Sequence, residues 1–335
     1  MIGIAVIGYG YWGPNLVRNF SLVDDARVVA VVDQRPEQRA TVERLYPTVQ
    51  TYADPADMLL NPDVDAVVIA TPVSSHFELS MQALQAGKHV MVEKPMTSTV
   101  ADGEKLVAEA AERGLTLMVD HTFIYTSAVR KIHELVGDGQ LGELYYYDSV
   151  RVNLGLFQHD VSVLWDLAVH DLSIMDFLLG QSPTSVAATG IAHVEGQPVN
   201  MAYLTCFFEG STIAHFHVNW LAPVKVRQTL ICGSERMVVF DDLEASEKVK
   251  VYDKGIVLGD PDQIGFEPRV GYRTGDMWAP RLDVTEALRV EAEHFVDCIN
   301  TGSTPESDGA AGLRIVRILE AATTSLGLQG APVEI

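Results

Sequence analysis

A lysine at the end of a predicted strand is the first residue of this sequence that suits acid–base chemistry. Lys94 stands in Glu93-Lys94-Pro95, directly after an apolar run at residues 89–93. Ligands of open α/β sheets bind at the carboxyl ends of the strands, and an ammonium group there can donate to a substrate oxygen as negative charge develops on it. The alternative is a lysine that ends a strand and extends into solvent.

A histidine and a carboxylate form the second group with catalytic potential. Asp166 and His170 are four residues apart in a predicted helix at residues 164–179, so they share one helix face. A carboxylate beside an imidazole orients it and makes it more basic, which suits a general base. The alternatives are a hydrogen bond on the helix surface or a histidine satisfied in the core. Asp171 faces another side and is expected to cap or pack locally.

A glycine-rich turn predicts a dinucleotide cofactor. The sequence Gly8-Tyr9-Gly10-Tyr11-Trp12-Gly13 follows an apolar strand and precedes a predicted helix that opens at Pro14. In this motif the first glycine permits a tight turn and the second lets the backbone approach the pyrophosphate. The third allows close packing of helix on strand, and the pyrophosphate lies at the helix N-terminus.

The residue that ends the second predicted strand favours NAD over NADP. Asp33 follows Gly13 by 20 residues, and a carboxylate there accepts hydrogen bonds from the ribose hydroxyls and repels a 2′-phosphate. Arg35 could stack on the adenine or pair with a 2′-phosphate, which leaves NADP as the less favoured cofactor. The predicted contacts with the adenosine half are Asp33, Gln34 and Arg35.

The first 120 residues alternate short apolar runs with helical patterns. Several runs are almost continuously apolar, which is typical of parallel strands covered by helices on both faces. This alternation predicts a doubly wound α/β domain at residues 1–122. The predicted strands are residues 3–8, 27–33, 65–71, 89–93 and 115–120, and the predicted helices are residues 14–22, 36–46, 75–86 and 100–113.

After residue 122 strands follow one another without long helices between them. Strands in series pair antiparallel, so residues 123–335 are predicted to form an α+β domain on a large, mostly antiparallel open sheet. A segment at residues 253–283 is rich in Gly, Pro, Asp and Arg, which predicts a long loop that is either functional or a covering arm. The predicted strands are residues 143–153, 185–193, 201–209, 211–220, 227–232, 236–241 and 248–252, and the helices are residues 127–136, 164–179, 284–301 and 309–328.

The composition excludes some classes of partner. The chain has 335 residues, and 24 basic against 45 acidic side chains give a net charge of −21. That charge argues against binding to nucleic acid or to an anionic membrane surface. We expect a cytoplasmic protein, because there is no signal-peptide pattern, no apolar run of about 20 residues, and only three cysteines with no paired spacing.

The motifs and their order resemble the Gfo/Idh/MocA oxidoreductases. The glycine-rich turn, Ala70-Thr71-Pro72 with His76, Glu93-Lys94-Pro95 and Asp166-x-x-x-His170 all follow the family order. The resemblance implies a Rossmann domain, a second domain with an open sheet, a nicotinamide nucleotide and a sugar or cyclitol substrate. It places the catalytic groups on Lys94, Asp166 and His170. It adds further cofactor contacts at Thr71, Pro72, His76, Glu93 and Lys94.

A narrower resemblance points to a branch that includes nucleotide-sugar 3-dehydrogenases acting on UDP-N-acetylglucosamine. It rests on Gly10–Asn15, His121-Thr122-Phe123, residues 151–155 and Trp165-Asp166-Leu167. The chain departs from that branch at Asp120, at Thr126-Ser127 and at Val169. The implied substrate-binding residues are Lys94, His121, Arg151, Asn153, Asp166 and His170.

Arginines in the long loop offer a way to hold a diphosphate. Arg269, Arg273 and Arg281 could contact it bidentately, and we place Arg273 among the substrate-binding residues. Solvated surface arginines are the alternative. His215 and His217 share one strand face, but no Cys or carboxylate completes a metal set, so we predict stacked side chains and no metal.

An apolar sheet face predicts self-association. Phe207, Phe216, Val218 and Trp220, with Met237, Val239 and Phe240, would leave one face of the second sheet apolar. A face without a helix over it needs another subunit, so we expect a homodimer or homotetramer.

These observations predict an NAD-dependent oxidoreductase that acts on a ring hydroxyl of a sugar, at C3 of a nucleotide-linked hexose. Three alternatives stay open. They are an inositol or free-sugar dehydrogenase, an NAD-dependent glycosidase with no net redox change, and a regulator that senses dinucleotide.

Overall fold

The computed structural model describes residues 1–155, 161–258 and 270–335, which form two compact units. The first unit comprises residues 1–126 and 285–320, and the second comprises residues 127–284 and 321–335. The predicted boundary after residue 122 lies four residues before this change of unit. The prediction also did not foresee that residues 285–320 return to the first unit.

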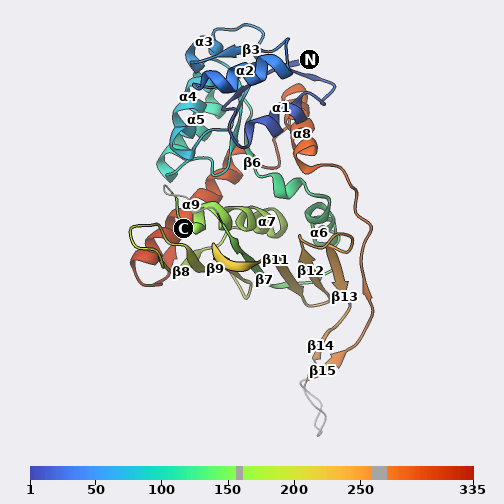
Figure 1. Ribbon diagram of the computed structural model, residues 1–335. Coiled ribbons are helices and arrows are strands. Elements are labelled where there is room, and N and C mark those ends of the chain that lie inside the picture. The colour runs from blue at the N-terminus through green and yellow to red at the C-terminus, as the bar shows by residue number, and fades with distance from the viewer. Residues whose placement is uncertain (156–160, 259–269) are drawn as a thin grey trace. The chain divides into compact units, whose positions relative to one another are not determined.

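The first unit contains a six-stranded parallel sheet with the order β3-β2-β1-β4-β5-β6. Helices α4 and α5 lie on one side of it and α1 and α8 on the other (Figure 1), which confirms the predicted doubly wound domain. The carboxyl ends of β1, β4, β5 and β6 therefore share one edge, where such sheets bind ligands. The strands are β1 Ile2–Ile7, β2 Ala26–Val32, β3 Gln50–Tyr52, β4 Ala66–Ile69, β5 His89–Glu93 and β6 Leu117–Asp120. The helices before β6 are α1 Gly13–Phe20, α2 Pro36–Leu45, α3 Pro55–Leu59, α4 His76–Gln85 and α5 Val100–Arg113, with the short turn η1 Val73–Ser75.

The late helices join the first unit through close apolar contacts. Helix α8 (Ala287–Thr301) places Phe295 edge-on to Phe20 of α1, with ring centroids 6.3 Å apart. Helix α9 (Gly309–Gly327) approaches β6 so closely that a Cβ at Gly312 would lie 2.5 Å from a methyl of Val119. An amphipathic pattern predicts that a helix is covered, but it does not say which sheet covers it.

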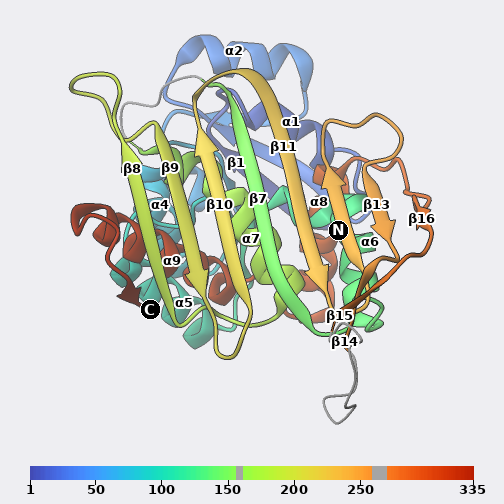
Figure 2. The same ribbon diagram turned by 90° about the horizontal axis from the view of Figure 1, so that it is seen from below.

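The second unit is built on a nine-stranded sheet with the order β16-β13-β12-β11-β7-β10-β9-β8-β17. Only β7 and β10 pair in parallel among its described strands, so the predicted, mostly antiparallel open sheet is confirmed. Figure 2 shows the broad face of β8, β9, β10, β7 and β11 with α6 and α7 behind it. The strands are β7 Leu144–Leu154, β8 Ser185–Ile191, β9 Met201–Phe207, β10 Ile213–Asn219, β11 Leu221–Gly233, β12 Met237–Asp241, β13 Val249–Tyr252, β16 Met277–Trp278 and β17 Val333–Glu334.

Other elements complete the chain. The segments η2 Thr122–Tyr125 and α6 Ser127–Gly137 lie between β6 and β7 in sequence, and the π-helix η3 Leu164–Ala168 and α7 Val169–Leu179 lie between β7 and β8. The region predicted as one long loop contains a two-stranded ladder, β14 Gly255–Leu258 with β15 Val270–Arg273. No helix in the described ranges is both long and apolar enough to cross a membrane.

The two faces of the large sheet carry different side chains from those predicted. Phe216, Val218 and Trp220 are fully buried, whereas Phe207 is 36% exposed. The expectation that these four residues line one uncovered apolar face is therefore wrong. Alternation along a strand shows which residues share a face, but the tertiary fold decides which face the helices cover.

Aromatic and histidine side chains occupy the opposite face of β9 and β10. Tyr203 stacks on His217 with ring centroids 4.5 Å apart and lies 6.0 Å from His215. His215 also contacts Asp148, with Nδ1 3.2 Å from Oδ1. The predicted stacking is confirmed.

Candidate functional site

The glycine-rich turn has the geometry that a dinucleotide requires. Gly8 has a φ of +97°, and a Cβ there would lie 2.4 Å from the carbonyl oxygen of Ala70. A Cβ at Gly13 would lie 2.1 Å from the Gly8 oxygen, whereas one at Gly10 would meet nothing nearer than 3.7 Å. The first and third glycines are thus needed for the fold of the turn, and the second leaves open backbone at the start of α1 for a pyrophosphate.

Asp33 is held ready to accept hydrogen bonds at the end of β2. Its oxygens accept from the main-chain N–H of Tyr9 at 2.8 Å and from Arg35 Nε and Nη2 at 2.9 and 2.8 Å. Burial alone would raise the pKa of Asp33, but the hydrogen bonds from Arg35 and Tyr9 outweigh it and hold the pKa at about 2. The group is therefore ionised at neutral pH, which suits ribose hydroxyls and opposes a 2′-phosphate.

His76 ties two site loops together through its ring nitrogens. Nδ1 lies 2.9 Å from the carbonyl oxygen of Pro95, and Nε2 lies 2.8 Å from that of Thr71. The side chain is 1% exposed, and burial lowers its pKa. His76 thus contacts the loops after β4 and β5, next to the cis Lys94–Pro95 peptide bond.

The ends of β5 and β6 bring Lys94 near polar groups of the first unit. Glu93 and Asp120 are paired across the two strands, and Glu93 Oε2 accepts the Lys94 main-chain N–H at 3.3 Å. Asp120 Oδ2 accepts from Trp12 Nε1 at 3.1 Å, so the glycine-rich turn is bonded to the end of β6. His121 is 3% exposed, and burial lowers its pKa to about 4, so its ring is neutral at pH 7.

The second unit holds Asp166 in a π-helical turn. The predicted single helix begins as η3, where the Val169 N–H reaches the carbonyl of Leu164, before α7 continues. A π-turn is wider than an α-turn, so it changes the angle between side chains that an α-helix would stack, and such turns are frequent at functional sites. Asp166 Oδ2 accepts from Trp220 Nε1 at 3.0 Å. Trp220 fits there because Gly155 has no Cβ, which would lie 2.5 Å from the indole.

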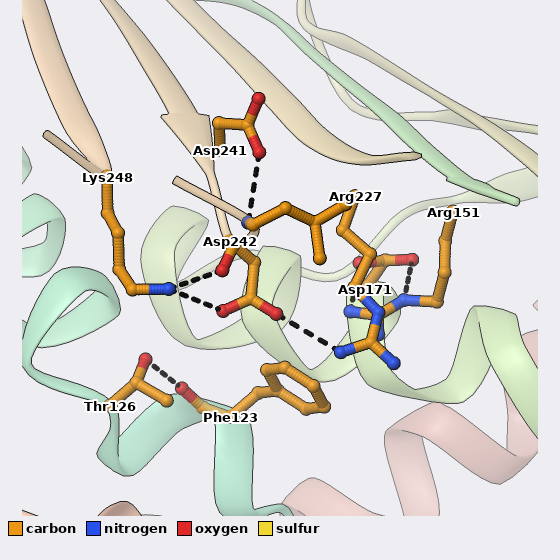
Figure 3. A network of polar contacts seen from close by, with 9 residues as sticks. Phe123, Thr126, Arg151, Asp171, Arg227, Asp241, Asp242 and Lys248 are labelled. Atoms are coloured by element: carbon orange, nitrogen blue, oxygen red, sulfur yellow. Dashed lines mark hydrogen bonds and ion pairs between the residues drawn. The ribbon is translucent and has the colours of Figure 1, made fainter. Parts of the chain in front are cut away.

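A buried ion pair fixes the start of α7 beside His170. Arg151 of β7 donates from Nε and Nη2 to the two oxygens of Asp171 at 2.8 and 2.9 Å, and both side chains are almost fully buried (Figure 3). Tyr147 Oη donates to the Asp171 carbonyl at 3.1 Å. Asp171 therefore reaches across to the sheet, where the sequence suggested a local role.

A second arginine lies directly opposite the first on β11. Arg227 is the cross-strand partner of Arg151, and its Nη1 donates to Asp242 Oδ2 at 3.1 Å (Figure 3). Lys248 Nζ contacts the carbonyl oxygen of Asp242 and lies 3.5 Å from Oδ1. Like charges opposite one another repel, and the carboxylates of Asp171 and Asp242 offset that repulsion.

The other residues predicted to bind substrate take no part in the contacts of Arg151, Asp171, Arg227 and Asp242 described above. Asn153 is half-buried on β7. Arg273 of β15 contacts the Asp253 carboxylate and the Glu235 carbonyl, while Arg281 is exposed. Arg269 lies outside the described residues. Across the described ranges, no three His, Cys, Asp or Glu side chains form a group that could hold a metal ion.

Two family models match consecutive parts of the chain. One is described as the oxidoreductase family with an NAD-binding Rossmann fold and matches residues 2–121. The other is described as the GFO/IDH/MocA C-terminal domain and matches residues 129–239. Together they span most of the two units.

Named relatives cover most of the chain as well. UDP-N-acetylglucosamine 3-dehydrogenase of Acidithiobacillus ferrooxidans is 28% identical over 93% of both chains. 2,7-anhydro-N-acetylneuraminate hydratase of Mediterraneibacter gnavus is 32% identical over 75% of this chain and 70% of its own. A solved structure of the A. ferrooxidans dehydrogenase superposes with a TM-score of 0.83 at 24% identity, covering 98% of each chain, which shows the shared fold.

Proposed function

The chain belongs to the GFO/IDH/MocA oxidoreductase family, and on that premise we propose that it oxidises a nucleotide-linked hexose. The proposed substrate is UDP-N-acetylglucosamine or a close analogue, and the proposed position is the C3 hydroxyl. The observation that carries this choice is the end-to-end similarity to UDP-N-acetylglucosamine 3-dehydrogenase. The branch motifs around Trp12, Arg151 and Trp165 support it.

The proposed chemistry assigns one task to each polar group. The His170 imidazole accepts the proton of the substrate hydroxyl, and Lys94 donates a hydrogen bond that stabilises the same oxygen as charge develops. Bound nicotinamide supplies the hydride acceptor, so an alcohol becomes a ketone with one proton and one hydride removed. Asp166, itself held by Trp220, orients His170.

The turn at residues 8–13 and Asp33 are the proposed contacts for NAD, in preference to NADP. The fit rests on the open backbone at Gly10 and on the ionised Asp33. We also propose a cytoplasmic homodimer or homotetramer that associates through the uncovered face of the large sheet. The stacked aromatic and histidine side chains of β9 and β10 lie on that face and are the observation that supports this proposal.

The decisive experiment combines a substrate panel with catalytic variants. NADH formation is followed with UDP- and dTDP-sugars, inositols and free sugars. His170→Ala should lose about 10²–10⁴-fold in kcat on the true substrate, and Lys94→Ala should lose a comparable factor. The double variant should lose less than the product of the two, because both groups act on one oxygen.

Two exposed residues provide controls for these variants. His193→Ala removes an exposed histidine of the second unit, and Lys105→Ala removes a lysine of α5 whose side chain is 59% exposed. Both should retain the activity of the unaltered protein. Full activity of His170→Ala would contradict the assignment and move the base role to Lys94. Turnover of inositol with none of any nucleotide sugar would contradict the proposed substrate.

A second candidate function follows from the hydratase among the relatives. A sugar could be oxidised transiently by bound NAD and reduced again, so that the product forms with no net NADH. Product formation with catalytic amounts of NAD, and no accumulation of NADH, would favour this reaction over the proposed dehydrogenase.

A further inference from the structure

We propose that Glu291 of α8 is a positioning residue for the dinucleotide-binding turn, which it supports by donating a hydrogen bond to Asp120. The inference depends on NAD binding by the first unit and is independent of which sugar is oxidised. No motif pointed to Glu291, which lies 171 residues after Asp120 in the chain.

Asp120 is the central acceptor of a buried cluster. Its Oδ2 accepts from Trp12 Nε1 at 3.1 Å and its Oδ1 accepts from Thr122 Oγ1 at 2.5 Å. Asp120 is 3% exposed, and Glu93 is its partner across the β5–β6 pair. Because Trp12 lies inside the glycine-rich turn, its hydrogen bond to Asp120 holds that turn against the end of β6.

Glu291 is fully buried beside this acceptor. Its exposure is 0%, and as a carboxylate it has no hydrogen-bond donor for either oxygen within the described structure. Burial, followed by the neighbouring Asp120 and Glu93, raises its pKa well above the ordinary value of 4.5. The raised pKa favours the protonated form of Glu291, whose O–H then has Asp120 as its acceptor. An ionised carboxylate in the same place would be both unsolvated and next to a like charge.

Glu93 shows the same behaviour on the other side of Asp120. Its Oε1 is inaccessible and lacks a donor among the described residues, and burial together with Asp120 raises its pKa. The cluster thus brings two acids with raised pKa values, Glu93 and Glu291, against Asp120. Lys94 and His121 are the other titratable groups facing it, and neither ring nitrogen of His121 has a hydrogen-bond partner in the described ranges.

Two further contacts lie on the elements packed around this cluster. Arg18 of α1 contacts Glu286, just before α8, at 2.6 Å. The short turn η2 contributes Tyr125, whose hydroxyl lies 3.0 Å from Ser307 Oγ. A proton on Glu291 would link α8 to Asp120 and, through the Trp12 hydrogen bond, to the glycine-rich turn.

A dependence on pH follows, with a definite sign. An acid whose pKa is raised by folding stabilises the protein fully below its unfolded pKa, and that contribution is lost as pH rises through the folded value. Loss of the Glu291 proton would place a second charge beside Asp120 and disturb the Trp12 contact. NAD affinity should therefore fall as pH rises through the raised pKa that Glu291 has in the folded protein.

The test is calorimetric titration of NAD into three variants over a range of pH. Glu291→Gln keeps an N–H donor without an ionisable proton, so it should bind NAD normally at low pH and lose the alkaline decline. Glu291→Ala should bind NAD about tenfold more weakly than the unaltered protein at the low end of the pH range, because a hydrogen bond to Asp120 is missing, and the difference should shrink as pH rises and the unaltered protein loses the same hydrogen bond. Glu293→Gln, on the same helix but 45% exposed and paired with Arg289, is the control and should follow the unaltered protein.

Two results would overturn the proposal. One is a pH profile of Glu291→Gln identical to that of the unaltered protein, and the other is undiminished NAD affinity in a folded Glu291→Ala. If Glu291→Ala does not fold, the pH profile of Glu291→Gln decides by itself. Failure of the sugar assignment would leave these titrations unchanged.

Discussion

The buried pair of Arg151 and Asp171 gives the most quantitative prediction for the second unit. Its two hydrogen bonds, at 2.8 and 2.9 Å, join β7 to the start of α7, and each side chain is at most 5% exposed. Removing one partner of such a pair leaves an uncompensated buried charge and costs about 3–5 kcal/mol. Asp171→Ala and Arg151→Met should each lower the free energy of unfolding of this unit by that amount.

A double variant distinguishes the cost of leaving one buried charge unpaired from the cost of losing the whole ion pair. Arg151→Met combined with Asp171→Leu removes both charges and should restore most of the loss, because an apolar replacement of a buried pair is close to neutral. The assay is urea unfolding, read as a double-mutant cycle. The control is Asp148→Asn on the same strand, whose contact with His215 is about 44% exposed and should be worth no more than about 1 kcal/mol.

The pair also has a predicted effect on catalysis. His170 immediately precedes Asp171, so loss of the ion pair should disturb the position of the proposed base. The double variant, although stable, should therefore have a lower kcat than the unaltered protein while it binds NAD normally. Single variants that lose less than about 1 kcal/mol, with a coupling energy near zero, would refute the reasoning. So would a double variant as unstable as either single one.

Two further predictions concern the ligands. Asp33→Asn should weaken NAD binding without a matching gain for NADP in a titration of both cofactors. In the unaltered protein the pKa of Asp33 is lowered to about 2, so the stability that this carboxylate contributes above its ordinary pKa of 3.8 should be lost as pH falls toward 2. Acid unfolding of Asp33→Asn should lack that loss. Tighter binding of NADP by the unaltered protein would reverse the cofactor preference. Arg273→Ala should raise KM for a nucleotide sugar more than it lowers kcat, because a contact with a diphosphate is made equally in the ground and transition states. An unchanged KM in steady-state assays would remove Arg273 from the substrate site.

Local sequence signals predicted the cofactor turn and the strands of the first sheet apart from β3 (Gln50–Tyr52), a three-residue edge strand without an apolar run. The position of Lys94 at a strand end and of Asp33 after β2 follows from apolar runs and short connections. The glycine requirement at Gly8 follows from a turn that needs a positive φ. These features depend on residues close together in the chain, which is why spacing alone predicts them.

The spacing of residues in the sequence could not predict contacts between segments that are far apart in the chain. Glu291 is brought next to Asp120 by a helix that returns to the first unit. Trp220 contacts Asp166 from the junction between β10 and β11, in the space left by Gly155. Nothing local distinguishes these side chains from ordinary helix or strand residues.

The sequence by itself determined the two fold classes, the dinucleotide turn and the residue types of the acid–base groups, because periodicity and short motifs are local properties. Only the tertiary structure decided which sheet α8 covers, which face of the large sheet is buried, and that Asp171 pairs with Arg151. The physical reason is that burial and charge pairing depend on what each face packs against, and that is set by contacts between residues far apart in the chain.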